Sequence, residues 1–234
     1  MRIPLLLALV AAAMAPRASG AQAAVPLIAT SAQGEVRVIP DRVKIWLSVQ
    51  SRGSSAARAA HENANKQTAV ISALHALSVP DSQISTEDYN VVPETRYDSD
   101  TKAPRIASYL VTNTLTVELM DVAIIGEVID ATLASGTNEI ESIVFFASRS
   151  DQLYQQALSA AVANAQTEAA IMAQAAGGRL GPLIELTNSG GWTNQSSKPL
   201  VAMALSASTQ TPILPGHQVI AASVSGKWVF LPSQ

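Results

Sequence analysis

Histidines are the side chains best suited to proton transfer or metal binding. The chain has three of them, and their spacing argues that they do not share one site. His61 and His75 fall within one predicted helix, which sets them about 40° apart around its axis but roughly 21 Å apart along it. His217 lies far along the chain, and neither an H-E-x-x-H run nor a cysteine is present. The sequence therefore predicts no metal site, no cofactor and no histidine-based catalytic centre.

Sequence motifs for nucleotide binding and for serine hydrolysis are not found in this chain. The run Gly177-Gly178-Arg179-Leu180-Gly181 is glycine-rich, but it follows a predicted helix, whereas a dinucleotide-binding loop opens one. A helix cap explains it better. No G-x-S-x-G elbow and no Walker A lysine motif occurs either. We therefore expect a protein that is not an enzyme, with a cryptic hydrolase as the weaker alternative.

Carboxylates gather around one predicted hairpin, at Glu87, Asp88, Glu94, Asp98 and Asp100. A calcium loop of the EF-hand type needs oxygen ligands at alternating positions, but Lys102 occupies the fifth position counted from Asp98. We interpret the cluster as a solvated polar turn.

The N-terminus has the features of a secretory signal. Met1-Arg2 precedes the apolar run Ile3 to Ala15, and small residues at Ala21 and Ala23 form an A-x-A cleavage site. Cleavage after Ala23 fits best, and cleavage after Gly20 or Ala21 is the alternative. The alternative, an uncleaved membrane anchor, is disfavoured because this run is shorter than the ~20 residues of a spanning helix. We expect residues 1–23 to be a cleavable signal peptide and residues 24–234 to form a single domain, periplasmic or secreted, with no membrane span after cleavage.

Composition narrows the classes of partner and chemistry. Removing the signal takes two arginines and no acid from a chain with 15 basic and 18 acidic residues, so the mature charge is about −5. A mildly acidic chain without a basic cluster disfavours nucleic acid and anionic lipid as partners. The chain has no cysteine, which excludes disulfides and thiol-based redox chemistry.

Hydrophobic periodicity predicts the elements of the first half. Apolar residues alternate over 32–38 and 43–49, with Pro40-Asp41 between them, and we expect these strands to form an antiparallel hairpin. A helix is predicted from Ser54 to Leu77. A second strand pair follows, over 84–92 and 109–119, with a polar turn near Asp98, and Asn113 in its apolar face is expected to make a buried hydrogen bond.

The second half alternates helices and strands. Asp121 and Gly136 bracket a helix, residues 140–147 form a strand, and an alanine-rich helix runs from Ser150 or Asp151 to Gly177. Strands follow over 183–187 and 219–231. The sequence thus predicts an α+β (mixed α/β) fold, a mostly antiparallel sheet with long helices packed on it, in the order ββαββ-αβ-αββ.

A candidate interaction surface comes from apolar residues without an evident place in this core. Trp46 points away from the apolar face of its strand, so either the sheet is covered on both sides or Trp46 meets another subunit. The long irregular segment 188–216 contains the others, and it either exposes an apolar contact surface or folds back over the chain's own sheet. The residues are Trp46, Trp192, Leu200, Val201, Met203 and Leu205.

The order of these elements and several short motifs resembles the SIMPL-domain family, which includes periplasmic immunogenic proteins and an oxidative stress defense protein. Each motif is weak alone, but their shared order is specific and covers nearly all of the mature chain. One departure is Ser78, which stands where the family usually has the glycine that ends the first long helix. The matching stretches are Gly34-Glu35-Val36, Pro40-Asp41, Glu62-Asn63, Leu74-His75-Ala76-Leu77, Ile84-Ser85-Thr86, Pro93, Tyr97-Asp98, Tyr109, Asn113, Gly136-Thr137-Asn138 and Pro215-Gly216.

The resemblance implies an envelope or secreted protein with a mixed α/β domain, self-association into a homo-oligomer, and a loose link to stress tolerance. It transfers no catalytic residue. An alternative is a module that binds a small molecule or an envelope protein partner, with 188–216 as a lid.

Overall fold

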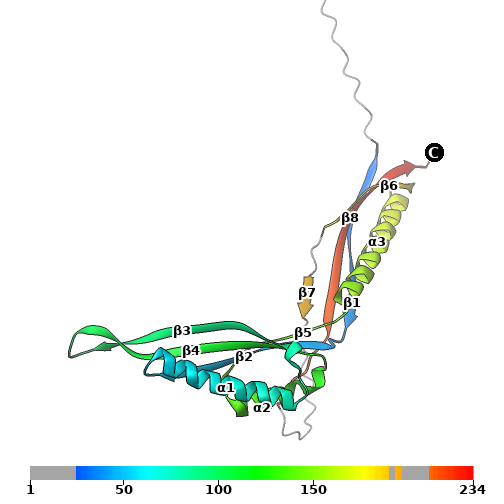
Figure 1. The fold of residues 1–234 in the computed structure, drawn as a ribbon. Helices are drawn as coiled ribbons and strands as arrows, with labels where there is room; N and C mark the ends of the chain where they lie inside the picture. The colour runs from blue at the N-terminus through cyan, green and yellow to red at the C-terminus, as the bar shows by residue number, and fades with distance from the viewer. Residues whose placement is uncertain (1–24, 190–192, 197–210, 234) are drawn as a thin grey trace, which may run out of the picture.

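The computed structural model, which describes residues 25–189, 193–196 and 211–233, separates the elements into two sheets, each backed by helices (Figure 1). The predicted order ββαββ-αβ-αββ and the α+β class are confirmed. The predicted signal peptide, residues 1–23, lies outside the described residues.

The first sheet, sheet B, has the strand order β3-β4-β2-β5, and all its pairs are antiparallel. Helices α1 and α2 pack against each other, and α1 packs on β2 and β4. Two short 3-10 turns, Asp81–Gln83 and Val122–Ile124, precede β3 and α2. The bounds are β2 Arg42–Gly53, α1 Ala56–Ala76, β3 Ile84–Asp98, β4 Ala103–Leu119, α2 Ile125–Ser135 and β5 Glu139–Phe146.

Alternation builds the core of sheet B. Every second residue of β2 from Val43 to Val49 is fully buried against the helices, which is the period of a strand with one covered face. Residues of α1 at steps of three and four meet this face, Val70 and Leu74 among them. Asn63 and Gln67 are the polar members of the helix stripe, and the Asn63 amide donates to the Val49 carbonyl at 2.7 Å.

The second sheet, sheet A, has the order β1-β8-β6, and β7 also pairs with β8. Helix α3 crosses all three long strands on one face. The bounds are β1 Leu27–Val38, α3 Ser150–Ala175, β6 Gly178–Asn188, β7 Thr193–Ser196 and β8 Gln218–Pro232.

A stripe of alanines lets α3 lie unusually close to sheet A. Five alanines at four-residue steps are fully buried, namely Ala157, Ala161, Ala165, Ala169 and Ala173. Opposite them, a Cβ added to Gly34 would lie 2.1 Å from the Ala157 carbonyl oxygen, so the strand residue must be glycine. Thr30 Oγ1 also donates to the Ala165 carbonyl at 3.1 Å, and Asn164 donates to the Gln33 carbonyl at 2.9 Å.

Residues in the left-handed region end the helices. Ser78, at φ 63°, follows α1, and its N–H and that of Val79 donate to the carbonyls of His75 and Leu74, which is a Schellman cap. The position favours glycine, so the serine accepts backbone strain there. Gly136 (φ 131°) and Gly177 (φ 76°) end α2 and α3, as predicted.

The predicted hairpin between the first two strands is wrong. Strand β1 pairs along its whole length with β8, from the other end of the chain, while β2 lies between β4 and β5 in the other sheet. Residues Ile39 to Asp41 connect the two sheets. Asp41 is tied instead to Ser148, whose N–H and hydroxyl donate to its carboxylate at 2.7 and 2.6 Å and lower its pKa.

Part of the segment 188–216 joins the fold. Strand β7 extends sheet A beside β8, and beyond it Thr211 donates through N–H and hydroxyl to Asp130 of α2. Ile213 packs against the core of sheet B. Within the described part of the chain, no helix combines the length and apolarity that crossing a membrane requires.

Candidate functional site: the uncovered sheet faces and the projecting hairpin

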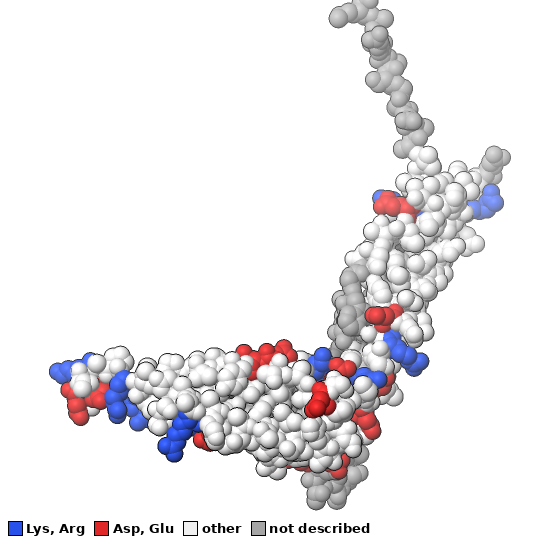
Figure 2. Space-filling view, viewed as in Figure 1, with Lys and Arg blue, Asp and Glu red and all other residues white. Residues whose placement is uncertain are grey.

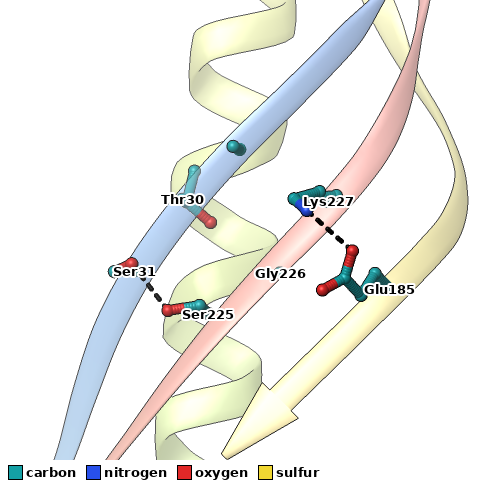
Figure 3. A pocket seen from close by; sticks show the side chains of 7 residues that line it. Thr30, Ser31, Glu185, Ser225, Gly226 and Lys227 are labelled. Atoms are coloured by element: carbon teal, nitrogen blue, oxygen red, sulfur yellow. Dashed lines mark hydrogen bonds and ion pairs between the residues drawn. The ribbon is translucent and has the colours of Figure 1, made fainter. Parts of the chain in front are cut away.

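Each sheet has its helices on one face, which leaves the opposite face as the surface on which function can be sought. On sheet A this face carries small side chains, and Figure 3 shows its hollow of about 170 Å³, lined by Ala29, Thr30, Ser31, Glu185, Ser225, Gly226 and Lys227. Gly226 belongs to this lining, and a Cβ there would lie 2.1 Å from the Trp228 ring, so a larger residue does not fit at this position.

Three serine hydroxyls form a chain across this face. Ser225 hydrogen-bonds Ser31 at 2.9 Å and Ser189 at 2.7 Å, and Lys227 donates to Glu185 at 2.7 Å alongside. The Lys227 ammonium lowers the pKa of the Glu185 carboxyl. None of these contacts gives a serine a general base, which nucleophilic catalysis requires. The hollow is suited to binding a polar group.

The uncovered face of sheet B centres on Trp46. This side chain is half-buried, and its indole N–H donates to Glu87 at 3.1 Å across the sheet. Thr116 donates to the same carboxylate oxygen at 2.5 Å, and these two hydrogen bonds lower the pKa of Glu87. Trp46 is thus held in one orientation on the face opposite the helices, where the sequence placed it.

We expect the indole N–H resonance of Trp46 to report the ionisation of Glu87. Because the hydrogen bonds favour the charged carboxylate, the folded-state pKa of Glu87 lies below the ordinary value of 4.5. The interaction therefore stabilises the folded protein fully above pH 4.5, and this stabilisation is lost as the pH falls through the folded-state pKa. In NMR spectra the resonance should titrate with a midpoint below 4.5. Glu87→Gln should abolish the titration and Trp46→Phe should remove the peak. A pH-independent resonance would contradict the contact.

A buried hydroxyl network lies next to Trp46 on the same face. Thr114 hydrogen-bonds Ser48 at 3.2 Å and Glu141 at 2.8 Å, although none of the described helices covers this side. Ser48 and Thr114 are nevertheless 0% and 3% exposed. These groups hold the sheet together and leave no free nucleophile at this place.

The hairpin of β3 and β4 projects beyond the rest of sheet B (Figure 1). Strand β2 pairs with β4 only as far as Tyr109, whereas β3 follows β4 to the turn at residues 99–102. Residues 93–98 and 103–108 therefore form a two-stranded ribbon, which we call the projecting ribbon. An isolated two-stranded ribbon is only marginally stable in water.

Apolar side chains on this hairpin face solvent. Tyr97 is 65% exposed and Ile106 is 51% exposed, and they share one ribbon face because Tyr97 pairs with Pro104 and Thr95 with Ile106. Tyr89 and Val91, nearer the body, are also exposed. Sequence reasoning predicted a polar turn near Asp98 and assigned these residues no function. What marks these residues is that they are apolar and lie in β3 and β4, which extend beyond the end of β2.

The predicted carboxylate turn is explained by structural contacts. Asp98 accepts from the N–H groups of Asp100 and Thr101 and pairs with Arg105 at 3.0 Å. Glu94 binds Arg52 and Ser108, which lower its pKa. Among the residues that the structure describes, no group of three metal-ligating side chains of the His, Cys, Asp and Glu type comes together.

The other predicted residues are dispersed or undescribed. His61 and His75 lie on α1, with His75 beside Asp81 at 2.8 Å, and His217 precedes β8 in the other sheet. A buried hydrogen bond was expected of Asn113, but its Oδ1 is buried without a partner in the described structure. Trp192, Leu200, Val201, Met203 and Leu205 lie outside the residues whose side chains are described.

Surface charge is scattered. On the face shown in Figure 2, basic and acidic side chains are interspersed and uncharged surface covers most of both sheets. At the far end of the projecting ribbon, on the left of Figure 2, side chains of both signs lie close together.

The fold and these faces define a class: an α+β protein of two antiparallel sheets, each backed by helices on one side. The chain belongs to the SIMPL family, whose model, described as a protein of unknown function (DUF541), matches residues 28–228.

Relatives are distant. A 26 kDa periplasmic immunogenic protein of Brucella melitensis is 29% identical over 163 residues, which is 68% of this chain and 65% of that protein. Its counterpart in Brucella abortus is 28% identical with the same coverage. The uncharacterized protein YggE of Escherichia coli K12 is 26% identical over 178 residues, covering 76% of this chain and 71% of that protein. The matched region thus spans slightly less than two thirds of the Brucella proteins.

Proposed function

We propose that this protein is exported to the periplasm and acts there without catalysis, by self-association. The N-terminal signal pattern supports export, and so does the word periplasmic in the names of the Brucella relatives. The projecting ribbon is the observation that carries self-association.

The ribbon supports assembly on energetic grounds. Burying the exposed parts of Tyr97 and Ile106 against a second copy would gain hydrophobic free energy that a monomer forgoes. It would also add a partner to a ribbon that has no third strand within the described part of the chain. A second copy fits this role because the ribbon carries charges of both signs, Asp98 and Arg105 among them, which the same surface on another copy can pair.

The residues that carry the family resemblance support a role without catalysis, because several of them pack helices or hold strands together. Gly34 admits α3, Asn63 binds the Val49 carbonyl, and Asp41 binds Ser148. Asn138 accepts from the N–H of Gln50 and donates to its carbonyl, which joins the start of β5 to β2. Any link to envelope or oxidative stress would be indirect, since a chain without cysteine cannot turn over peroxide through a thiol.

Light scattering of the mature chain, residues 24–234, tests the proposal. We expect an oligomer at micromolar concentration and a shift toward monomer in the double variant Tyr97→Ser/Ile106→Ser, which removes apolar surface without touching a buried residue. Arg96→Ser, at the intervening position on the ribbon, is the matched control and should leave the mass unchanged. A wild-type monomer throughout the range would refute self-association.

A second function, binding of a small molecule or envelope partner, is favoured by an apolar groove between α3 and β6. The groove measures about 490 Å³ and is bordered by Val162, Gln166, Ala170, Leu180, Pro182, Leu183 and Trp228. A largely apolar pocket of this size with one amide is typical of ligand sites. If 188–216 acts as a lid, two contacts limit its movement: β7 is paired with β8, and Thr211 is hydrogen-bonded to Asp130.

A further inference from the structure

We propose that a hollow at the end of sheet A nearest the connection to sheet B binds an organic monoanion with an aliphatic body, a medium-chain carboxylate. The hollow measures about 520 Å³ and is lined by Arg37, Val38, Ile39, His217 and Val219. It lies apart from the projecting ribbon, and the inference is independent of self-association.

Strand register brings these residues together. Arg37 of β1 pairs with Val219 of β8, so their side chains lie on the same face of sheet A. Side chains alternate between the two faces along a strand, and Gly34, three residues before Arg37, faces α3. Arg37 and Val219 therefore lie on the uncovered side of sheet A. Ile39 follows the end of β1, and His217 comes just before the start of β8. The two strand ends form opposite walls of one hollow.

The polar lining is basic. Arg37 and His217 are the ionisable residues among the described lining, and no carboxylate lines the hollow with them. Arg37 takes part in none of the ion pairs formed by the described residues, in contrast to Arg52 and Arg105, which bind carboxylates on the hairpin. A guanidinium presents a planar fork of donors that matches a carboxylate in bidentate geometry. An anion is therefore the complement of this wall.

The remaining lining is aliphatic. Ile39 and Val219 supply aliphatic side chains beside Arg37, Val38 borders the hollow at the strand position between Arg37 and Ile39, and Ile39 is 63% exposed. An alkyl chain beside them would remove apolar surface from water, which a small inorganic anion cannot do. The hollow is within the size range of small-molecule sites, where a mostly apolar lining holds a few orienting polar groups. Together the two halves favour a carboxylate that carries an alkyl chain.

The test is an NMR titration of the ¹⁵N-labelled mature chain at constant pH with octanoate, and with acetate and 1-octanol as separate halves of the ligand. We expect octanoate to shift the amide resonances of residues 37–39 and 217–219, with acetate and octanol at least tenfold weaker. Arg37→Ala should raise the octanoate Kd at least tenfold. Ile39→Ser should weaken octanoate while leaving the weak effect of acetate unchanged.

The matched control is Arg58→Ala, which removes an exposed arginine of α1 that likewise takes part in no described ion pair and should bind octanoate as the wild type does. Because Arg37 and Ile39 are exposed, both variants should fold, and their unperturbed distant resonances will verify it. Octanoate shifts elsewhere only, an unchanged Kd in Arg37→Ala, or octanol binding as tightly as octanoate would each overturn the proposal.

Discussion

Replacing Gly34 by alanine is expected to destabilise the protein by about 3 kcal/mol, because one added methyl group would collide with the backbone of α3. The new Cβ would lie 2.1 Å from the Ala157 carbonyl oxygen and 2.4 Å from the Ala161 nitrogen. Helix backbone cannot rotate aside as a side chain can, so α3 must move away from the sheet and its alanine stripe must lose contact.

Thermal unfolding followed by circular dichroism measures this effect. For a domain of this size the melting temperature should fall by roughly 6–12 °C. Gln33→Ala is the control, since the neighbouring side chain is exposed and the hydrogen bond to Asn164 uses the backbone carbonyl. Equal melting temperatures for the two variants would show that α3 does not approach β1 so closely.

Asn63→Asp should destabilise the protein by about 4 kcal/mol at neutral pH, since it places a charge in a buried site. The Asn63 side chain is fully buried, and its amide nitrogen is 2.7 Å from the Val49 carbonyl oxygen. The new carboxylate would replace this donor with a negative charge that faces the carbonyl oxygen. Burial would raise the folded-state pKa of the new carboxyl above its unfolded value.

The destabilisation by Asn63→Asp should depend on pH. Because the folded state binds the proton more tightly, the destabilisation is greatest above the folded-state pKa and shrinks as pH falls toward the unfolded value. Urea unfolding at pH 7 and at mildly acidic pH should show the difference. Asn65→Asp, the same change at an exposed position of α1, should stay within about 0.5 kcal/mol of wild type. Equal costs at the two positions would contradict the burial of Asn63.

Local patterns predicted the elements well because their causes are local. The alternation from Val43 to Val49 reflects one covered face, and the alanine spacing of α3 reflects one contact stripe. Helix ends at Gly136 and Gly177 follow from the conformations that glycine permits. The Ser78 departure also fell where the structure shows a left-handed residue.

Pairing between strands is not local, and that is where sequence reasoning failed. An alternating pattern specifies a strand and its covered face but not its neighbour, so nothing near Gly34 indicated that β1 pairs with β8. The candidate site was missed for a related reason. Exposure of Tyr97 and Ile106 follows from β2 ending earlier than β3 and β4, which only the register reveals. Trp46 alone could be placed, because its face follows from its own strand.

Hydrogen exchange along the projecting ribbon, measured from low to high micromolar concentration of the mature chain, tests the proposed function most directly. Self-association through the ribbon predicts that the amides of residues 93–98 and 103–108 gain protection as concentration rises, and that Tyr97→Ser/Ile106→Ser abolishes the gain. Exchange at these amides that is fast and independent of concentration would contradict the account.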